Sequence, residues 1–238
     1  EKQATNIKAR SSLILSPRSM EVQITGRVGL DTETQSKIAI EYGLRDDITI
    51  GISNSNYLNT FDYFCRTNYP NKLIDRFGFH FNLVYHSIIS TQTDKPLIID
   101  ELDRLKFLHQ LIIEYNIKSN IRFRVCPTYL HKNIADTKLE PKGYPWDMWF
   151  LKTGLDWFLN SNIEIYGSLI QQMTDTDISQ GSQSAIRAGI KYYLKTTSVD
   201  LSITNLYHLH GTAIIDDIGI NNYSENFRIG FQINKMFN

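Results

Sequence analysis

Apolar and polar residues alternate along residues 105–117. Six apolar residues occupy odd positions of this segment, and Lys106, Gln110, Glu114 and Asn116 lie between them. A period of two predicts a β-strand that has one apolar face and one polar face. The strand is long, because the alternation continues over thirteen positions.

A second segment of the same kind, residues 121–129, follows after a turn at residues 118–120. The two segments therefore predict a β-hairpin, in which opposite charges and aromatic rings meet as favourable cross-strand neighbours. The predicted pairs are Glu114 with Arg124, Tyr115 with Phe123, and Ile117 with Ile121 across the turn.

Alternation of this type recurs along the chain and predicts about twelve strands. The expected segments are 20–31, 37–44, 48–53, 60–67, 77–90, 105–117, 121–129, 149–159, 163–169, 185–194, 199–208 and 226–237. Residues 1–19 show no period, and we interpret them as an amino-terminal arm that lies on the periplasmic side or folds into the lumen. Residues 20–238 then form one all-β antiparallel up-and-down barrel.

The alternation alone does not say which face is buried. In a soluble barrel the apolar face is the interior, whereas in an outer-membrane barrel it meets lipid and the polar face lines the lumen. The connections favour the membrane, because short turns near residues 46, 119, 161 and 197 alternate with longer polar stretches at 91–104, 133–145, 174–183 and 209–225. Short periplasmic turns and long outer loops are typical of outer-membrane barrels. The link at 68–76 fits the short set imperfectly.

Aromatic residues gather at the strand ends, where the two interfacial girdles of a membrane barrel belong. Those near the short turns are Tyr42, Tyr115, Trp157, Phe158, Tyr192 and Tyr193, and those near the long loops are Tyr57, Phe61, Tyr129, Trp146, Trp149 and Tyr207. Several strands also have the length needed to cross the apolar band of about 25 Å when tilted. We therefore predict a transmembrane β-barrel of the bacterial outer membrane.

Composition narrows the class of protein further. The 25 basic and 25 acidic residues cancel, which argues against a nucleic-acid partner. No apolar run approaches the length of a transmembrane helix. The two cysteines, Cys65 and Cys126, fit neither a disulfide scaffold nor a metal cluster. The chain begins at Glu1, and we interpret it as a mature protein after removal of a signal peptide.

The order of the strand motifs is similar to that of a known family. The sequence contains VQITGRVG, then IAIEYGL-RDD-ITIGI, and closes on FRIGFQINKMF. It resembles the uncharacterised outer-membrane β-barrel family common in Bacteroidota, a domain of unknown function. The resemblance implies a barrel and carries no catalytic residue over to this chain.

Charged residues on the polar face are the candidate site residues, because that face would line the lumen. They are Arg27, Glu41, Glu114, Arg122, Arg124, Lys152, Asp156, Glu164, Arg187, Lys191, Asp200 and Arg228. Charges in such an environment must be paired or hydrated. Two interpretations remain open. Networks such as Glu114–Arg124 bond the lumen shut, or the charges line a narrow polar channel, since twelve strands enclose more room than side chains fill.

Chemistry beyond the lumen has little support. His208 and His210 share a face near the outer mouth and are weak metal candidates that lack a defined third ligand. His86 and Ser87 are adjacent on a strand and point to opposite faces, so they cannot form a catalytic pair. We expect no cofactor and no enzyme activity.

Four functions stay in play. The first is a non-enzymatic outer-membrane barrel, either a structural or anchoring subunit of an assembly or a narrow channel; its partners are outer-membrane lipid and other outer-membrane or periplasmic subunits. The others are a substrate-selective porin, an outer-membrane hydrolase with its site in loops that contain His208, His210 and Asp216, and a soluble lipid-binding barrel. The last predicts that Trp157 and Phe231 face inward.

Overall fold

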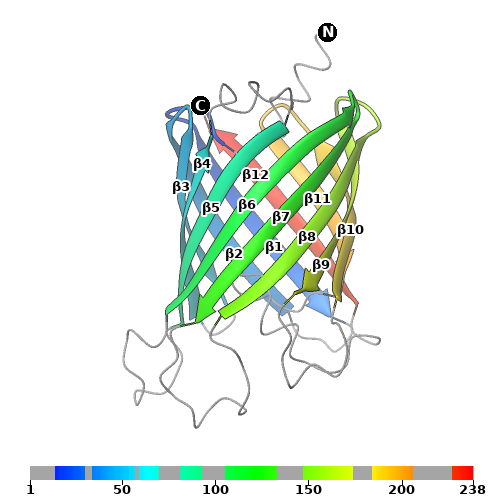
Figure 1. The fold of residues 1–238 in the computed structure, drawn as a ribbon. Helices are drawn as coiled ribbons and strands as arrows, with labels where there is room; N and C mark the ends of the chain where they lie inside the picture. The colour runs from blue at the N-terminus through cyan, green and yellow to red at the C-terminus, as the bar shows by residue number, and fades with distance from the viewer. Residues whose placement is uncertain are drawn as a thin grey trace.

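Twelve antiparallel strands form a closed barrel in which each strand pairs with its neighbours in the sequence (Figure 1). The structure is a computed structural model that describes residues 14–29, 34–56, 59–69, 81–92, 105–132, 147–173, 184–205 and 227–237. The strands are β1 Met20–Gly29, β2 Thr34–Arg45, β3 Ile48–Ser55, β4 Thr60–Asn68, β5 Phe81–Gln92, β6 Leu105–Lys118, β7 Ile121–Lys132, β8 Asp147–Phe158, β9 Ile163–Gln172, β10 Ser184–Tyr193, β11 Thr197–Thr204 and β12 Arg228–Phe237. Pairing of β1 with β12 closes the barrel, with Met20 opposite Phe237.

The predicted twelve-stranded barrel is confirmed, with strand bounds that differ by up to four residues. β5 begins at Phe81 and continues to Gln92, whereas the alternation predicted residues 77–90. β11 ends at Thr204 instead of residue 208. Residues 77–80 and 206–208 lie outside the described part of the chain.

The β6–β7 hairpin has the predicted register over most of its length. Glu114 lies opposite Arg124, and Tyr115 lies opposite Phe123. The predicted pair of Ile117 with Ile121 is wrong, because the register shifts between Asn116 and Lys118 and Ile121 pairs with Lys118. A bulge leaves one residue of a strand unpaired and is common at barrel rims. The turn is shortened by one residue as a result.

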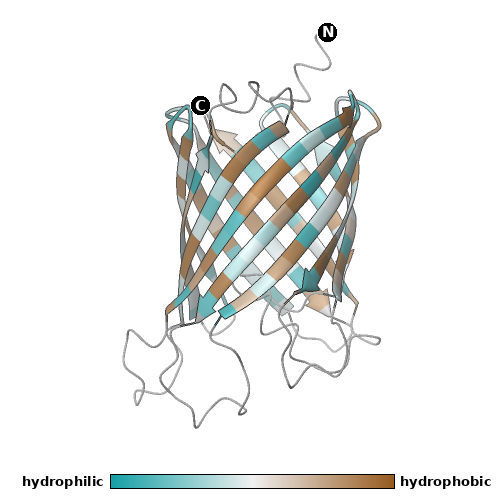
Figure 2. Ribbon diagram, in the orientation of Figure 1, coloured by the Kyte–Doolittle hydropathy of each residue, from teal (hydrophilic) through white to brown (hydrophobic). Residues whose placement is uncertain are grey.

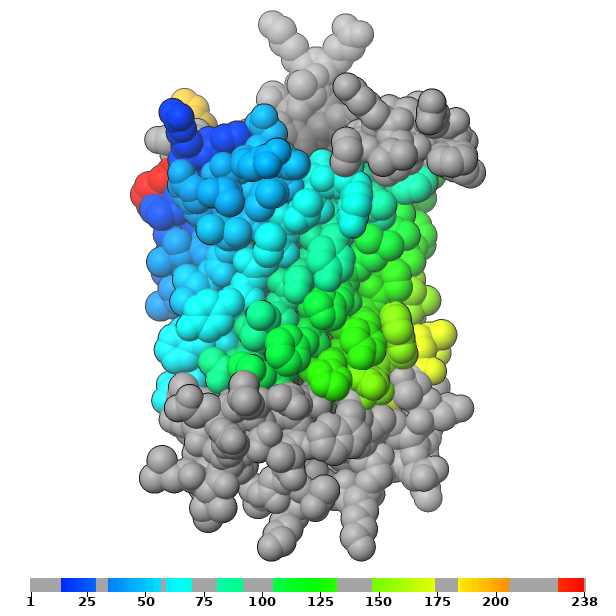
Figure 3. All heavy atoms as spheres, turned by 60° about the vertical axis from the view of Figure 1, so that its left-hand side comes forward, coloured from blue at the N-terminus to red at the C-terminus, as the bar shows by residue number. Residues whose placement is uncertain are grey.

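The two faces of the wall have opposite character. Apolar side chains are exposed on the outside of every strand. Figure 2 shows the underlying pattern, in which apolar (brown) and polar (teal) residues alternate along the strands. Figure 3 shows the side chains of successive strands packed into a continuous wall. Trp157 and Phe231 are 48% and 42% exposed on the outside. This contradicts the soluble lipid-binding barrel, which required both to face inward.

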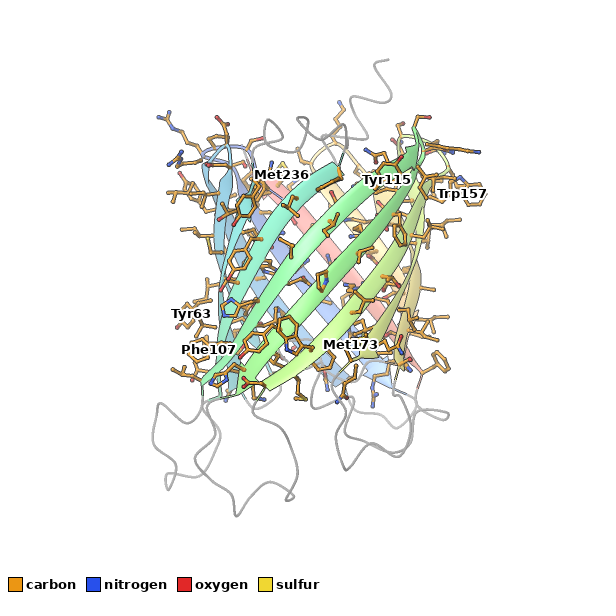
Figure 4. All side chains as sticks on the ribbon, viewed as in Figure 1. Tyr63, Phe107, Tyr115, Trp157, Met173 and Met236 are labelled. Atoms are coloured by element: carbon orange, nitrogen blue, oxygen red, sulfur yellow. The ribbon has the colours of Figure 1, made fainter. Side chains whose placement is uncertain are left out.

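Fewer aromatic residues than predicted belong to the interfacial girdles. Tyr115 and Trp157 lie on the outside near the short turns, and Phe107 lies near the opposite end (Figure 4). Phe158 and Tyr193 are buried inside the barrel, so their assignment to the girdle is wrong. Each of them follows an outward-facing aromatic residue, and successive strand residues point to opposite faces.

Helices and cysteines add two further observations. In the described residues, no helix is long and apolar enough to cross a membrane. Cys65 and Cys126 are both free cysteines. Their strands, β4 and β7, are not neighbours in the barrel.

A charge placed on the outer face should destabilise the barrel according to its depth. Leu201 is exposed at the middle of β11, so Leu201→Arg is expected to lower the free energy of unfolding in lipid vesicles by about 2–4 kcal/mol. Leu159 is similarly exposed but lies beside a short turn, and Leu159→Arg is the matched control, with an expected cost of about 0–1 kcal/mol. Urea unfolding followed by tryptophan fluorescence measures both. Equal costs would mean that the outer face does not meet lipid.

Candidate functional site: a polar cavity inside the barrel

The twelve charged residues singled out from the sequence occupy inward-facing positions of the wall. Their side chains are buried or half-buried, whereas the apolar residues on either side of them are mostly exposed on the outside. They do not form one cluster. Some of them form an ion-pair network at the short-turn end of the lumen, and others form a second group at mid-height. The rest are single residues near the long-loop end.

The strongest ion-pair network joins β7 to β8. Asp156 is fully buried and accepts from Arg122 Nε at 3.0 Å and from Arg124 Nη2. Glu114 lies 3.7 Å from Arg122 Nη1 and accepts from the Asn82 amide at 3.3 Å. The predicted ion pair of Glu114 with Arg124 is therefore wrong, although the two residues lie opposite each other. Arg124 pairs with Asp156, and Glu114 lies near Arg122.

The reason is visible in the register of β7 and β8. Arg122 lies opposite Asp156, and Arg124 lies opposite Gly154. A glycine leaves open space across from Arg124, and the Arg124 guanidinium turns toward Asp156. The sequence shows which carboxylates are near, but only the register shows which one is reached.

Tyrosine hydroxyls bind the remaining carboxylates of this region. Tyr193 donates to Glu164 at 2.5 Å, and Tyr166 donates to Asp200 at 2.7 Å. Arg187 lies 3.5 Å from the same Asp200 carboxylate and above the Tyr166 ring. These neutral donors stabilise buried carboxylates without adding charge to the lumen.

Several inward-facing charged residues were missed by the sequence reasoning. They are Glu21, Lys37, Asp62, Arg66 and Lys106. Asp62 binds Lys37 Nζ at 3.0 Å and accepts from Ser53 and Ser90, and Arg66 pairs with Glu41. β4 gives a weak alternation because Tyr63 and Phe64 are both aromatic, which hid Asp62 and Arg66. Glu21, Lys37 and Lys106 lay in clearly alternating segments and could have been found.

Near the long-loop end, every strand contributes a buried inward-facing side chain. We call these twelve residues the outer ring: Arg27, Gln35, Ser55, Thr60, Ser90, Lys106, Leu130, Met148, Ile170, Ala185, Thr204 and Arg228. Part of the ring belongs to an apolar cluster with Ile88, Leu108 and Phe150. The described side chains at this end are thus buried around the whole circumference.

The opposite end of the lumen is hollow. A cavity of about 260 Å³ opens between the strands and the short turns, and we call it the mouth cavity. Its charged lining from the strands consists of Glu21, Glu41, Arg66, Arg122, Arg124, Glu164 and Lys191. In outer-membrane barrels, short turns mark the periplasmic side.

Residues 14–19 enter this mouth and fix its shape. Residues 16–19 form a tight turn in which the Ser19 amide donates to the Ser16 carbonyl at 3.1 Å. Pro17 sets the first central position, and Arg18 has a φ of 65° at the second. The turn reverses the chain just before β1, which directs Ile14 and Leu15 into the barrel.

We call the inner-wall contacts of this segment the amino-terminal seat. Ile14 is buried in an apolar cluster with Val84, Ile112 and Cys126. The Leu15 amide donates to Thr49 Oγ1 at 2.8 Å. Of the periplasmic and luminal positions predicted for the arm, these two residues occupy the luminal one, and Leu15 lines the mouth cavity.

Gly43 makes the seat sterically feasible. The Arg18 backbone amide donates to the Gly43 carbonyl at 2.8 Å, and the Gly43 amide donates to the Ser19 carbonyl at 2.9 Å. A side chain at position 43 would overlap the Ser16 carbonyl oxygen. Only glycine lets the two backbones approach this closely.

No metal or catalytic site emerges from the described residues. They contain no group of three or more His, Cys, Asp and Glu placed to hold a metal ion. His208, His210 and Asp216 lie outside them. His86 faces the lumen and Ser87 the outside, as expected of neighbours on a strand.

The continuous apolar exterior, the charged lumen and the short-turn mouth define a membrane-spanning β-barrel of the outer-membrane type. The chain belongs to the family described as membrane bound beta barrel domain (DUF5777), which it matches over residues 18–237. The resemblance to an outer-membrane β-barrel family of unknown function is thereby confirmed. No curated protein matches the chain.

Solved structures share this fold at low sequence identity. The KdgM porin in complex with disordered oligogalacturonate is 8% identical with a TM-score of 0.60, and the alignment covers 92% of this chain and 99% of the porin. The NanC porin is 6% identical with a TM-score of 0.60, covering 91% and 98%. The COG4313 outer membrane channel from Pseudomonas putida F1 is 10% identical with a TM-score of 0.61, covering 94% and 97%. At these identities the likeness concerns the fold alone.

Proposed function

We propose that the protein is a narrow outer-membrane channel for small polar solutes. The observation that carries the proposal is the mouth cavity, a charge-lined space at the periplasmic end of the lumen. A barrel filled only for stability would pack this space with apolar side chains, as it does around Phe150. Charges of both signs in the lumen suit hydrated solutes better than lipids.

The structural neighbours support the same function. Proteins with this fold include two named porins and one named outer membrane channel. Their low identity transfers no solute to this chain. They show that a barrel of this architecture is compatible with conduction.

A second candidate is a non-conducting barrel that anchors or supports an outer-membrane assembly. The outer ring favours it, because its side chains are buried around the whole circumference in this conformation. Under the channel hypothesis the outer ring must open for conduction. Under the anchoring hypothesis it stays closed.

Single-channel recording in a planar bilayer separates the two candidates. The channel hypothesis predicts discrete conductance steps for the purified full-length protein, and the anchoring hypothesis predicts none at any voltage.

Ion selectivity of a Lys152 variant tests whether the current passes through the lumen. Lys152 faces the lumen at mid-height and forms no ion pair within the described residues. In a potassium chloride gradient, Lys152→Glu is expected to reduce the anion-to-cation permeability ratio by about threefold.

Lys235→Glu is the matched control for this charge reversal. Lys235 is exposed on the outside of β12 and donates to Thr196 Oγ1 at 2.9 Å. Its reversal should leave the permeability ratio unchanged. Steps that are equally selective in wild type, Lys152→Glu and Lys235→Glu would show that current does not pass through the lumen.

A further inference from the structure

Three cations gather on one side of the inner wall. They are Arg124 on β7, Lys152 on β8 and Arg187 on β10, and we call them the basic cluster. The Arg124 and Arg187 side chains are 30% and 27% exposed, whereas those of Lys37 and Arg66 on the facing wall are 15% exposed. Because these positions face the lumen, the exposed surface of the cluster lies inside the barrel.

Small residues on β8 and β9 leave room between the two arginines. Arg124 lies opposite Gly154 on β8, and Arg187 lies opposite Ser168 on β9. Gly154 and Ser168 are themselves paired, so the four residues form one row across four strands. The nearest atom to a methyl group added at Gly154 would lie 3.5 Å away, so this part of the row is not crowded.

Both guanidinium groups lean toward the middle of this row. Arg124 reaches from β7 to Asp156 on β8. Arg187 reaches from β10 to β9, where its guanidinium carbon lies 5.3 Å from the centroid of the Tyr166 ring. Asp156 and Tyr166 are directly opposite each other in the β8–β9 pair. The charged ends of the two arginines therefore converge on two adjacent strands.

Lys152 adds a third positive charge beside them. It forms no ion pair and no hydrogen bond within the described residues, and both Arg124 and Arg187 act on it electrostatically. Asp156, the carboxylate that attracts it, is already bonded to Arg122 and Arg124. Like charges repel strongly when they are partly removed from water, and a bound anion would relieve this repulsion.

The site also has hydrogen-bond donors that no acceptor uses. Arg187 Nε is buried and has no hydrogen-bond partner in the described part of the chain. Ser168 Oγ likewise forms no hydrogen bond with the described residues. Donors that surround a group of cations match an anion with several acceptor oxygens.

We propose that the basic cluster binds the phosphate group of a small solute. Lys152 and the two guanidinium groups donate charge-assisted hydrogen bonds to its oxygens, and the Ser168 hydroxyl donates one more. A phosphate group carries about 1.5–2 negative charges and three acceptor oxygens. A carboxylate offers one charge and two oxygens, so it would satisfy fewer of these donors.

This inference rests on the proposed channel function in one respect, since it names the class of solute that the channel would admit. Binding itself requires no conduction. Calorimetric titration of the full-length protein in detergent with inorganic phosphate, at constant ionic strength and neutral pH, therefore tests the site independently. We expect a dissociation constant in the millimolar range, because the contacts are partly exposed to water. Acetate, the carboxylate probe, should bind about tenfold more weakly.

Changes at Lys152 test the cluster without leaving a carboxylate unpaired. Lys152→Met should weaken phosphate binding about tenfold, whereas Lys152→Arg keeps the charge and should stay within about threefold of the wild type. Arg187→Gln is a second variant with an expected loss of similar size. Asp200, which lies 3.5 Å from Arg187, keeps the hydrogen bond from the Tyr166 hydroxyl in that variant.

Lys37→Gln is the matched control inside the lumen. Lys37 belongs to β2, which is six strands away from β8 around the barrel, and it donates to Asp62 at 3.0 Å. Asp62 also accepts from Ser53 and Ser90, so it keeps two donors in the variant. The change removes one lumen charge far from the cluster and should leave phosphate affinity within about twofold of the wild type.

The proposal is overturned if phosphate does not bind, or if Lys152→Met weakens it no more than Lys37→Gln does. Acetate that binds as tightly as phosphate would also overturn it, because the wall would then attract anions without recognising phosphate. A conducting protein that does not bind phosphate refutes the phosphate site alone. A silent protein that binds phosphate refutes the channel alone.

Discussion

Asp156→Asn is expected to lower the free energy of unfolding by about 3–5 kcal/mol, because it leaves buried cations without their counter-charge. Asp156 is fully buried between Arg122 and Arg124. Asparagine has nearly the same shape, so the loss arises from charge. Without the carboxylate, two guanidinium groups face each other inside the wall and only the more distant Glu114 remains near Arg122.

Urea unfolding in lipid vesicles measures this loss. Asp47→Asn is the control, because the ion pair of Arg45 with Asp47 at 3.3 Å lies in an exposed turn and its removal should change stability by less than about 0.5 kcal/mol. Adding Arg122→Met to Asp156→Asn should recover part of the stability, since it removes one of the uncompensated charges. A loss at Asp156 no larger than at Asp47, or no recovery in the double variant, would show that the network does not stabilise the barrel.

The sequence predicted the barrel because lipid and lumen impose opposite requirements on alternate residues. Ile190 and Leu201 illustrate this, since they pair across β10 and β11 and both face outward. The neighbouring residues Lys191 and Asp200 also pair and both face inward. The same alternation therefore predicts both the strand and which of its residues face lipid or lumen.

Features that depend on register were harder to predict. Alternation places Glu114 and Arg124 on the same face, but it does not reveal that Gly154 opposite Arg124 lets the guanidinium reach Asp156. The bulge beside Ile117 was missed for a similar reason, because a single unpaired residue leaves no mark in the hydrophobic pattern.

The mouth cavity was beyond the reach of sequence reasoning. Glu21 and Lys191 lie 170 positions apart and meet the same space only because β1 closes on β12. Nothing in their local sequence separates them from Glu41 or Arg122, which are paired. Closure of the barrel therefore decides which charges share the cavity.

Opening the amino-terminal seat is expected to raise the reactivity of the Cys126 thiol. Cys126 faces the lumen and is buried beneath Ile14 together with Val84 and Ile112. A methyl group at position 43 would overlap the Ser16 carbonyl, so Gly43→Ala should displace the segment that holds Ile14 in place. In a Cys65→Ser background, labelling of Cys126 by a membrane-impermeant maleimide is then expected to become about tenfold faster.

Gly167→Ala is the matched control for this experiment. Gly167 lies on β9, and no atom lies within 4 Å of an added methyl group there. It should label at the rate of the Cys65→Ser parent. Ile14→Ser opens the same seat without touching β2, so it separates loss of the seat from damage to the wall. If Cys126 remains unreactive in both Gly43→Ala and Ile14→Ser, the segment does not control access to this part of the lumen. If both react faster, residues 14–19 restrict the periplasmic mouth, and any solute that reaches the mouth cavity must pass beside Leu15.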